Sequence, residues 1–156
     1  MDIHSRINRS IAKNTPVIGV AVGSGLSAKQ VAEGGADFLL ALSAGYFRNA
    51  GVSSLGCMLP FGNSNELNLR FAEKEILPRV KNTPVIFGAF ASDITKSDEA
   101  LLERIISAGF VGVNNFPTVG LIDGSYRQAL EDAGLGFERE IKFMKKAVEK
   151  GLFTEC

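Results

Sequence analysis

Histidine and cysteine are nearly absent from this chain. Its 156 residues include one histidine, His4, and two cysteines, Cys57 and Cys156. A single imidazole excludes Ser-His-Asp, Cys-His and multi-histidine metal sites unless another chain supplies the histidine. The two thiols lie far apart in the sequence, so neither a disulfide framework nor a thiolate metal site is predicted, and a reducing cytoplasm fits best. Any chemistry must therefore use carboxylates, Arg, Lys, Ser or Tyr.

Net charge and long apolar runs are absent as well. The 17 Lys and Arg residues balance the 17 Asp and Glu residues, so the chain lacks the positive surface that direct nucleic-acid binding needs. No run approaches the roughly 20 apolar residues of a membrane span. Residues 1–14 hold no apolar segment long enough for a signal peptide. We expect a soluble, cytoplasmic protein that binds neither nucleic acid nor membrane.

Short apolar runs are what the sequence has instead. Its 46% apolar content is enough for the core of one domain, which we place at residues 1–156. Runs rich in Val, Ile, Leu and Phe are typical of strands buried on both faces of a parallel sheet. Four such runs are predicted as strands and a fifth begins near the C-terminus: residues 16–22, 37–42, 84–90, 110–115 and 151–154.

Helical patterns fill the gaps between these runs. Glycine ends several of them, because it accepts the left-handed conformation at a helix C-terminus. Helices are predicted over residues 27–33, 66–77, 95–109, 125–133 and 137–150. Ser64 or Asn65 is the predicted cap of the second helix, and Thr95 with Asp98 forms a possible capping box at the start of the third, which Gly109 ends. Residues 43–63 are predicted as a long structureless connection, of the kind that forms functional lids or subunit contacts.

An internal repeat constrains the fold further. The sequence Lys-Asn-Thr-Pro-Val-Ile occurs at 13–18 and again at 81–86, and each copy opens a β-α-β-α unit. Two such units in tandem make half of an eight-stranded β/α barrel, whose complete form needs roughly 250 residues. The pattern therefore predicts an α/β fold, the N-terminal half of a TIM barrel with about four β/α units. An open flavodoxin-like sheet fits the same periodicity and is the alternative.

Four stretches of the sequence carry a resemblance to a known family. They are residues 19–29, 47–51, 59–63 and 115–124, the last reading Asn-Phe-Pro-Thr-Val-Gly-Leu-Ile-Asp-Gly. Together they resemble the phosphoenolpyruvate hydrolase-like family of TIM-barrel enzymes. That family also includes the C-terminal domain of a plant antiviral resistance protein and domains in some bacterial regulators. The resemblance covers nearly the whole chain, and it implies an incomplete barrel, because family members continue with the remaining strands.

The resemblance implies a function as well as a fold. It implies an enzyme acting on a small anionic substrate of the phosphoenolpyruvate or 2-keto acid class by hydrolysis or lyase chemistry, with Mg²⁺ as candidate cofactor. A half-barrel would also have two exposed strand edges, so a third interpretation is a chain that needs a homo-oligomer, or association with a C-terminal half of the barrel, to fold stably. The family often has Arg where this chain has Tyr46, a further Arg near Val52, and Asp near Asn63. These departures favour the alternative, a non-catalytic ligand-sensing or interaction domain of a regulatory protein.

Candidate site residues follow the predicted strands, because parallel β/α folds bind ligands at the carboxyl ends of their strands. Ser24 and Gly25 begin a helix whose free N–H groups could hold a phosphate or carboxylate, or they form an ordinary glycine turn. Ser43 is a candidate substrate contact. Arg48 could fork onto an anion as a catalytic group, although a structural ion pair or an oligomer contact fits equally well.

The third and fourth strands supply the remaining candidates. Asp93 suits a general base or a Mg²⁺ ligand, and a cap of the following turn is the competing interpretation. Asn114 and Asn115 interrupt an apolar run, so their amides either bind ligand or tie loops together. Thr118 follows in the same loop and is a further candidate substrate contact. Cys57 has no histidine to activate it and is read as a small buried hydrophobe.

Overall fold

The computed structural model describes residues 2–156 and contains one five-stranded sheet. All strands are parallel, and each pairs only with its neighbours in sequence. The strands are β1 (Gly19–Val22), β2 (Phe38–Ala41), β3 (Val85–Gly88), β4 (Gly112–Asn114) and β5 (Phe153–Glu155). The sequential order is that of a barrel wall, whereas a flavodoxin-like sheet has β1 inside the order. The predicted half-barrel is therefore confirmed, the predicted fifth strand included, and the flavodoxin-like alternative is wrong.

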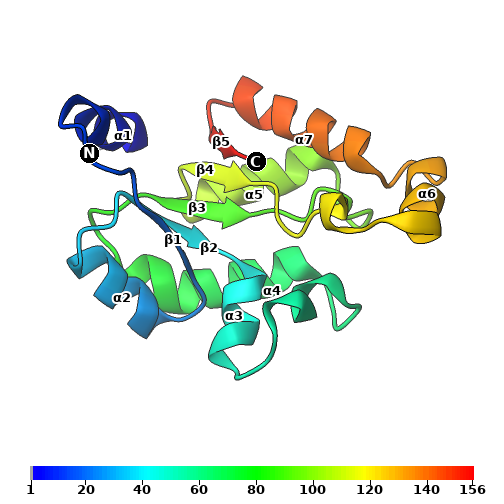
Figure 1. Ribbon diagram of the computed structural model, residues 1–156, viewed down its shortest axis with the longest axis horizontal. Helices are drawn as coiled ribbons and strands as arrows, with labels where there is room; N and C mark the ends of the chain where they lie inside the picture. Colours follow the sequence, from blue (N-terminus) through cyan, green and yellow to red (C-terminus); the bar gives the residue numbers. More distant parts are fainter. Residues whose placement is uncertain (1) are drawn as a thin grey trace.

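Helices alternate with these strands along the chain (Figure 1). They are α1 (Ile3–Ala12), α2 (Gly25–Glu33), α3 (Ser43–Asn49), α4 (Ser64–Phe71), α5 (Asp98–Ala108), α6 (Gly124–Asp132) and α7 (Phe137–Glu149). After α4 the chain continues through a π-helical turn, Ala72–Ile76, and a 3₁₀ turn, Leu77–Arg79, that contains Pro78. None of the helices in residues 2–156 is long and apolar enough to cross a membrane.

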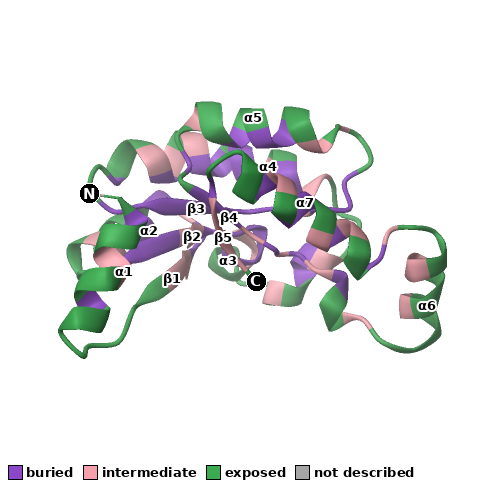
Figure 2. Cartoon of the chain, turned by 90° about the horizontal axis from the view of Figure 1, so that it is seen from above, coloured by how far each residue is buried: buried purple, intermediate pink, exposed green. Residues whose placement is uncertain are grey.

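The main core lies between the sheet and four of the helices. Side chains such as Leu39 and Phe87 pack from the sheet against α2, α4, α5 and α7, where Leu102 and Phe143 are fully buried. Figure 2 shows buried segments of α4 and α5 facing the strands. A smaller cluster lies on the other face, where Ile3 of α1 packs with Phe38 of β2 and Ile86 of β3. The four helices thereby leave the opposite face of the sheet to α1 and the strand-end loops.

Several predicted element boundaries are wrong for local reasons. The connection 43–63 is not structureless, because it contains α3 and a 3₁₀ turn, Ser54–Met58. Helix α4 is capped by Asn63, whose side chain accepts from the Glu66 backbone, and not by Ser64 or Asn65. Helix α5 is capped by Ser97 rather than by a Thr95–Asp98 box.

Helix α1 is an element that the sequence patterns did not predict. Residues 1–14 read as a polar stretch, but Asp2 caps the helix and Ile3 anchors it in the smaller core. Arg6 ties it down further, since its guanidinium donates to the backbone oxygens of Ala36 and Asn82. These contacts are distant in sequence, so local periodicity does not reveal them.

Candidate active site

The carboxyl ends of the strands meet at one edge of the sheet, and the loops that follow them pack closely there. A Cβ atom placed on Gly23, after β1, would lie 1.9 Å from the carbonyl carbon of Gly45 in α3. Such an approach requires glycine, because any side chain at this position would overlap the backbone of the neighbouring loop. The strand-end loops therefore form one continuous surface.

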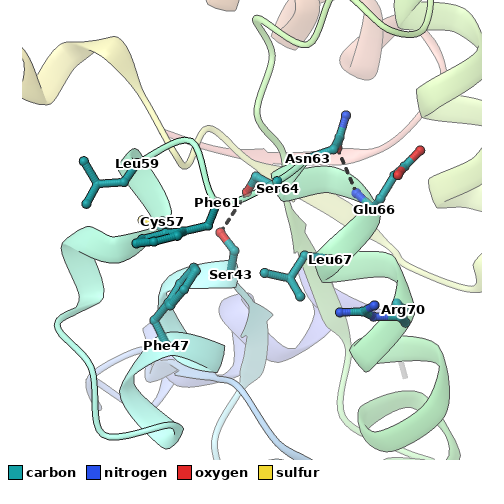
Figure 3. Close-up of a pocket in the computed structure, with 11 residues that line it drawn as sticks. Ser43, Phe47, Cys57, Leu59, Phe61, Asn63, Ser64, Glu66, Leu67 and Arg70 are labelled. Atoms are coloured by element: carbon teal, nitrogen blue, oxygen red, sulfur yellow. Dashed lines mark hydrogen bonds between the residues drawn. The ribbon is translucent and has the colours of Figure 1, made fainter.

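A pocket of about 330 Å³ opens in this surface between α3 and α4, and we call it the Ser43 pocket (Figure 3). Ser43 is the first residue of α3, Ser64 is the first residue of α4, and their hydroxyl oxygens lie 2.8 Å apart. Phe47 and Phe61 form its apolar side. Since one hydroxyl donates to the other, one of the two protons remains free to bind a ligand.

Arg70 supplies the positive charge of the Ser43 pocket. Its side chain extends from α4 toward the pocket (Figure 3), and within residues 2–156 its guanidinium has no hydrogen-bond or ion-pair partner. The other charged residue in the wall, Glu66, is paired with Lys96 at 2.8 Å. The pocket thus offers an unpaired guanidinium and a hydroxyl pair, which are groups that bind carboxylates and phosphates.

Arg70 is a residue that the sequence reasoning missed. It lies inside the predicted helix 66–77, where no residue was singled out as a candidate. A usable signal was present in the spacing, because Ser64, Leu67 and Arg70 lie three residues apart and therefore share one helix face. That face forms part of the pocket wall.

A second cavity of about 490 Å³ adjoins the Ser43 pocket, and we call it the apolar cavity. The two share a strip of wall made by Cys57, Leu59, Gly62, Asn63 and Ser64. Most of its remaining wall is apolar and comes from three separate segments of the chain: Phe90, Ile94, Pro117, Val119, Ile122, Tyr126, Leu130 and Leu135.

Asp93 lies in the wall of the apolar cavity, and both of its carboxylate oxygens are occupied. One accepts from the backbone and hydroxyl of Thr95, and the other accepts from the amides of Asn63 and Asn65 at 2.8 and 3.1 Å. Burial alone would raise the pKa of Asp93, but the hydrogen bonds from Thr95, Asn63 and Asn65 outweigh burial and hold the pKa below its usual value. Asp93 is therefore an ionised group that ties the loop after β3 to the start of α4.

The loop after β4 is held by a fully buried acid that the sequence reasoning did not single out. Glu140 of α7 accepts from the amide of Asn115 at 2.7 Å, the hydroxyl of Thr118 at 2.7 Å and the backbone of Val119 at 2.8 Å. Asn115 and Thr118, which were predicted to contact the substrate, thus both donate to Glu140 inside the protein. Asn115 ties loops together, one of its two expected roles, while its Oδ1 atom is buried without a partner.

Asn114 faces the acid at the end of the neighbouring strand. It pairs in register with Glu155 of β5, and its amide donates to that carboxyl group at 3.3 Å. Burial raises the pKa of Glu155, and the hydrogen bond from Asn114 offsets part of that effect. The Oδ1 atom of Asn114 is buried and unpartnered.

Ser24 and Gly25, which follow β1, and Arg48 of α3 lie outside the walls of both pockets. Ser24 caps α2 and forms a reciprocal capping box with Ser27, while the backbone N–H of Gly25 donates to the carboxylate of Glu75 at 3.3 Å. The guanidinium of Arg48 donates to Ser54 at 3.0 Å and to a backbone oxygen of β1 at 3.4 Å. The structure therefore brings together Ser43 and Asp93 at the two pockets, but not Ser24, Gly25 or Arg48.

The donor set of this edge does not fit a Mg²⁺ ion. Mg²⁺ prefers carboxylate and other hard oxygen ligands in octahedral geometry. Nowhere in residues 2–156 do three His, Cys, Asp or Glu side chains gather as a possible metal site. Asp93, the carboxylate at the apolar cavity, already accepts four hydrogen bonds. Cys57 is buried as predicted, and burial raises the pKa of its thiol, so it does not act as a thiolate ligand.

Solved structures share this fold. The phosphoenolpyruvate phosphomutase of Streptomyces platensis subsp. rosaceus superposes with a TM-score of 0.58 at 16% identity, over 98% of this chain and 50% of that chain. A phosphonopyruvate hydrolase in complex with oxalate and Mg²⁺ superposes with a TM-score of 0.51 at 14% identity, over 97% of this chain and 61% of that chain. At these identities the likeness shows the fold, which is about half of a TIM barrel.

Sequence relatives identify the family. The protein y4pA of Sinorhizobium fredii, named as a transcriptional regulatory protein, is 47% identical over 141 residues, 90% of this chain and 23% of that protein. The ToMV resistance protein Tm-1 of Solanum lycopersicum is 41% identical over 152 residues, 97% of this chain and 20% of that protein. The chain thus spans about a fifth of the length of these relatives. Because the profile described as phosphoenolpyruvate hydrolase-like matches residues 2–156, this chain belongs to the phosphoenolpyruvate hydrolase-like family.

Proposed function

We propose that this chain is an enzyme domain that binds a small organic anion of the phosphoenolpyruvate or 2-keto acid class in the Ser43 pocket. The observation that carries the proposal is the unpaired guanidinium of Arg70 in one pocket with the hydroxyl pair of Ser43 and Ser64. That pocket lies at the carboxyl ends of the strands, where β/α barrels bind their substrates. Family membership supports the same substrate class.

The proposed roles follow from which groups are free. Arg70 neutralises the anion, and the free proton of the Ser43–Ser64 pair is donated to one of its oxygens. Asp93 keeps its charge and orients Asn63, the residue that caps α4 and lies in the walls of both pockets. Its low pKa makes Asp93 a weak general base, so we assign it positioning rather than proton transfer.

Two of the predicted contacts need a rearrangement before they can reach an anion. Arg48 would have to leave Ser54, and the N–H group of Gly25 would have to leave the carboxylate of Glu75. Both remain predictions for a second contact with a larger anion such as a phosphate ester. We assign no role to Mg²⁺ in the proposal, because four hydrogen bonds already occupy the carboxylate of Asp93.

A non-catalytic ligand-sensing domain is the second candidate function. It is favoured by the carboxylates of the two cavities, because Asp93 in the apolar cavity is saturated with hydrogen bonds and Glu66 in the Ser43 pocket is paired with Lys96, so neither is an evident base. The name of the relative y4pA is consistent with a regulatory role. Binding of an anion without turnover would support this candidate over the enzyme.

Anion binding and turnover are tested on the same protein. Calorimetric titration with oxalate, pyruvate and phosphoenolpyruvate should show saturable binding that Arg70→Ala weakens by about tenfold, the effect of losing a hydrogen bond to a charged group. Arg9→Ala, on the exposed side of α1, is the matched control. Equal binding by the wild type and Arg70→Ala contradicts the proposed site, and release of phosphate or pyruvate distinguishes the enzyme from the sensor.

The two edges of the sheet support a further part of the proposal. Strands β1 and β5 are the outermost strands, so each leaves one side of its backbone unpaired by another strand. We propose that these edges associate with a second copy or with further β/α units of a barrel, in the cytoplasm. Light scattering of the purified chain tests this, because a monomer at all concentrations contradicts self-association.

A further inference from the structure

The apolar cavity has the composition of a site for an uncharged group. Its wall includes Phe90, Val119, Leu130 and Leu135, and its volume is about 490 Å³. Ligand sites of roughly 300–1,000 Å³ with a mostly apolar lining and a few convergent polar groups are typical of small-molecule binding. The neighbouring Ser43 pocket, at about 330 Å³, supplies the polar groups.

Three polar side chains of the cavity wall already donate hydrogen bonds inside the protein, and the two other hydroxyl groups belong to Ser64 on the strip shared with the Ser43 pocket and to the exposed Tyr126. Ser92 donates to the backbone oxygen of Leu135 at 3.1 Å, and Thr95 and Asn63 both donate to Asp93. A carboxylate or phosphate placed here would find no free donor among these side chains. It would also face the negative charge of Asp93, so the cavity disfavours an anion and tolerates an apolar group.

Part of the apolar wall of the cavity is exposed to solvent on its outer side. Helix α6 projects from the body in Figures 1 and 2, and none of its residues is buried. Tyr126 on α6 is 64% exposed and Ile94 on the opposite side is 79% exposed, although both line the cavity. An apolar group that fills the space would bury this surface and gain the corresponding hydrophobic free energy.

The Ser43 pocket and the apolar cavity meet along their shared strip of wall, where Gly62 has no side chain to separate them. A Cβ atom placed on Gly62 would have no heavy atom within 4 Å, so open space lies over this position. A ligand whose charged end contacts Arg70 and Ser43 can therefore extend across Gly62 toward Leu130. We propose that the ligand of this domain is a 2-keto acid with a branched or aromatic side chain, and that this side chain occupies the apolar cavity.

This inference rests on the proposed function, and a series of acids tests the two separately. Calorimetry compares pyruvate, 4-methyl-2-oxovalerate and phenylpyruvate on the 156-residue chain. Each buried methylene is expected to raise the affinity about fourfold, so 4-methyl-2-oxovalerate should bind at least about tenfold more tightly than pyruvate. Affinity that does not increase with the side chain, while Arg70→Ala still weakens pyruvate binding, overturns this inference alone. Absence of binding, or binding insensitive to Arg70→Ala, overturns the proposed function as well.

Substitutions that fill the cavity locate the side chain of the ligand. Leu130→Trp should remove the gain for the two larger acids and leave pyruvate affinity within about twofold, while Val148→Trp, at an exposed position of α7, should change neither. Ile94→Trp at the exposed rim is a second variant that does not disturb packing. If Leu130→Trp and Ile94→Trp leave the preference for larger acids unchanged, the side chain binds elsewhere and the inference is wrong.

Discussion

The hydroxyl oxygens of Ser43 and Ser64 lie 2.8 Å apart, which joins the first residues of two helices that begin 21 positions apart in the chain. Ser43 opens α3 with one residue between it and the end of β2, and Ser64 opens α4 after the long connection. The contact therefore closes the connection 43–63 onto the sheet edge and places both hydroxyls in the wall of the pocket that Arg70 also lines. The proposed anion site depends on this closure.

Removal of one hydroxyl should weaken ligand binding without unfolding the protein. We expect Ser43→Ala to lower oxalate affinity about fivefold, since a neutral hydrogen bond contributes about 1 kcal/mol. Ser64→Ala should have a similar effect, and the double variant should lose less than the sum because the two hydroxyls are coupled. Calorimetry measures all three, and Ser107→Ala on the exposed side of α5 is the control. Fully additive losses would show that the two hydroxyls act independently.

Asp93 should stabilise the fold in a pH-dependent way. Asp93→Asn places an NH₂ group or a weaker acceptor against the donors of Thr95, Asn63 and Asn65, so we expect a loss of about 2 kcal/mol at pH 7. The folded-state pKa lies below the ordinary 3.8, so this stability is present above that value and is lost as the pH falls through the folded pKa. Urea unfolding at pH 7 and at pH 3 measures it.

The control for that experiment is Asp123→Asn. Asp123 is exposed and makes no capping hydrogen bond at the start of α6, so its amide variant should unfold like the wild type. The gap in unfolding free energy between the wild type and Asp93→Asn should narrow at pH 3. A gap that is the same at both pH values would show that the charge of Asp93 does not matter.

Glu140 should be required for the shape of the loop after β4. Glu140→Gln turns one acceptor into a donor that faces the donors of Asn115, Thr118 or Val119. Because the side chain is fully buried, we expect a loss of about 2–3 kcal/mol in the free energy of unfolding. Glu138→Gln, on the exposed side of the same helix, should be neutral. Thermal unfolding measures the midpoints of the two variants. Equal midpoints for Glu140→Gln and Glu138→Gln would contradict the structural role of Glu140.

Mg²⁺ should neither stabilise this chain nor support anion binding. The carboxylate of Asp93 is filled by hydrogen bonds, and no acidic cluster exists in the described part of the chain, residues 2–156. Thermal unfolding with Mg²⁺ or with EDTA should give the same midpoint, and oxalate affinity should not change. A Mg²⁺-dependent rise in the midpoint that Asp93→Asn abolishes would show that the loop rearranges into a metal site.

The sequence predicted the fold better than it predicted the site. Buried parallel strands have a local signature, so the strands and the half-barrel follow from apolar runs and the repeat at 13–18 and 81–86. Helix α1 was missed because its anchor, Ile3, packs against residues distant in sequence. The rule that ligands bind after parallel strands selected Ser43 and Asp93, which line the two cavities, and their roles toward a ligand stay predictions.

The site residues that sequence reasoning missed depend on which groups are already paired. Glu140 uses the donors of Asn115, and Glu75 holds the helix N-terminus at Gly25, and neither pairing has a sequence signature. Arg48 and Arg70 look equivalent as isolated cations in the sequence. Only the structure shows that Arg48 is hydrogen-bonded to Ser54 while Arg70 is free beside the Ser43 pocket.

A crystal structure of the chain grown with oxalate would show whether a small organic anion binds between Arg70 and the two serine hydroxyls. We expect oxalate in the Ser43 pocket, with one carboxylate contacting the guanidinium of Arg70 and the other within hydrogen-bond distance of Ser43 or Ser64. Oxalate at the start of α2 beside Gly25, or no bound oxalate at saturating concentration, would contradict the claim.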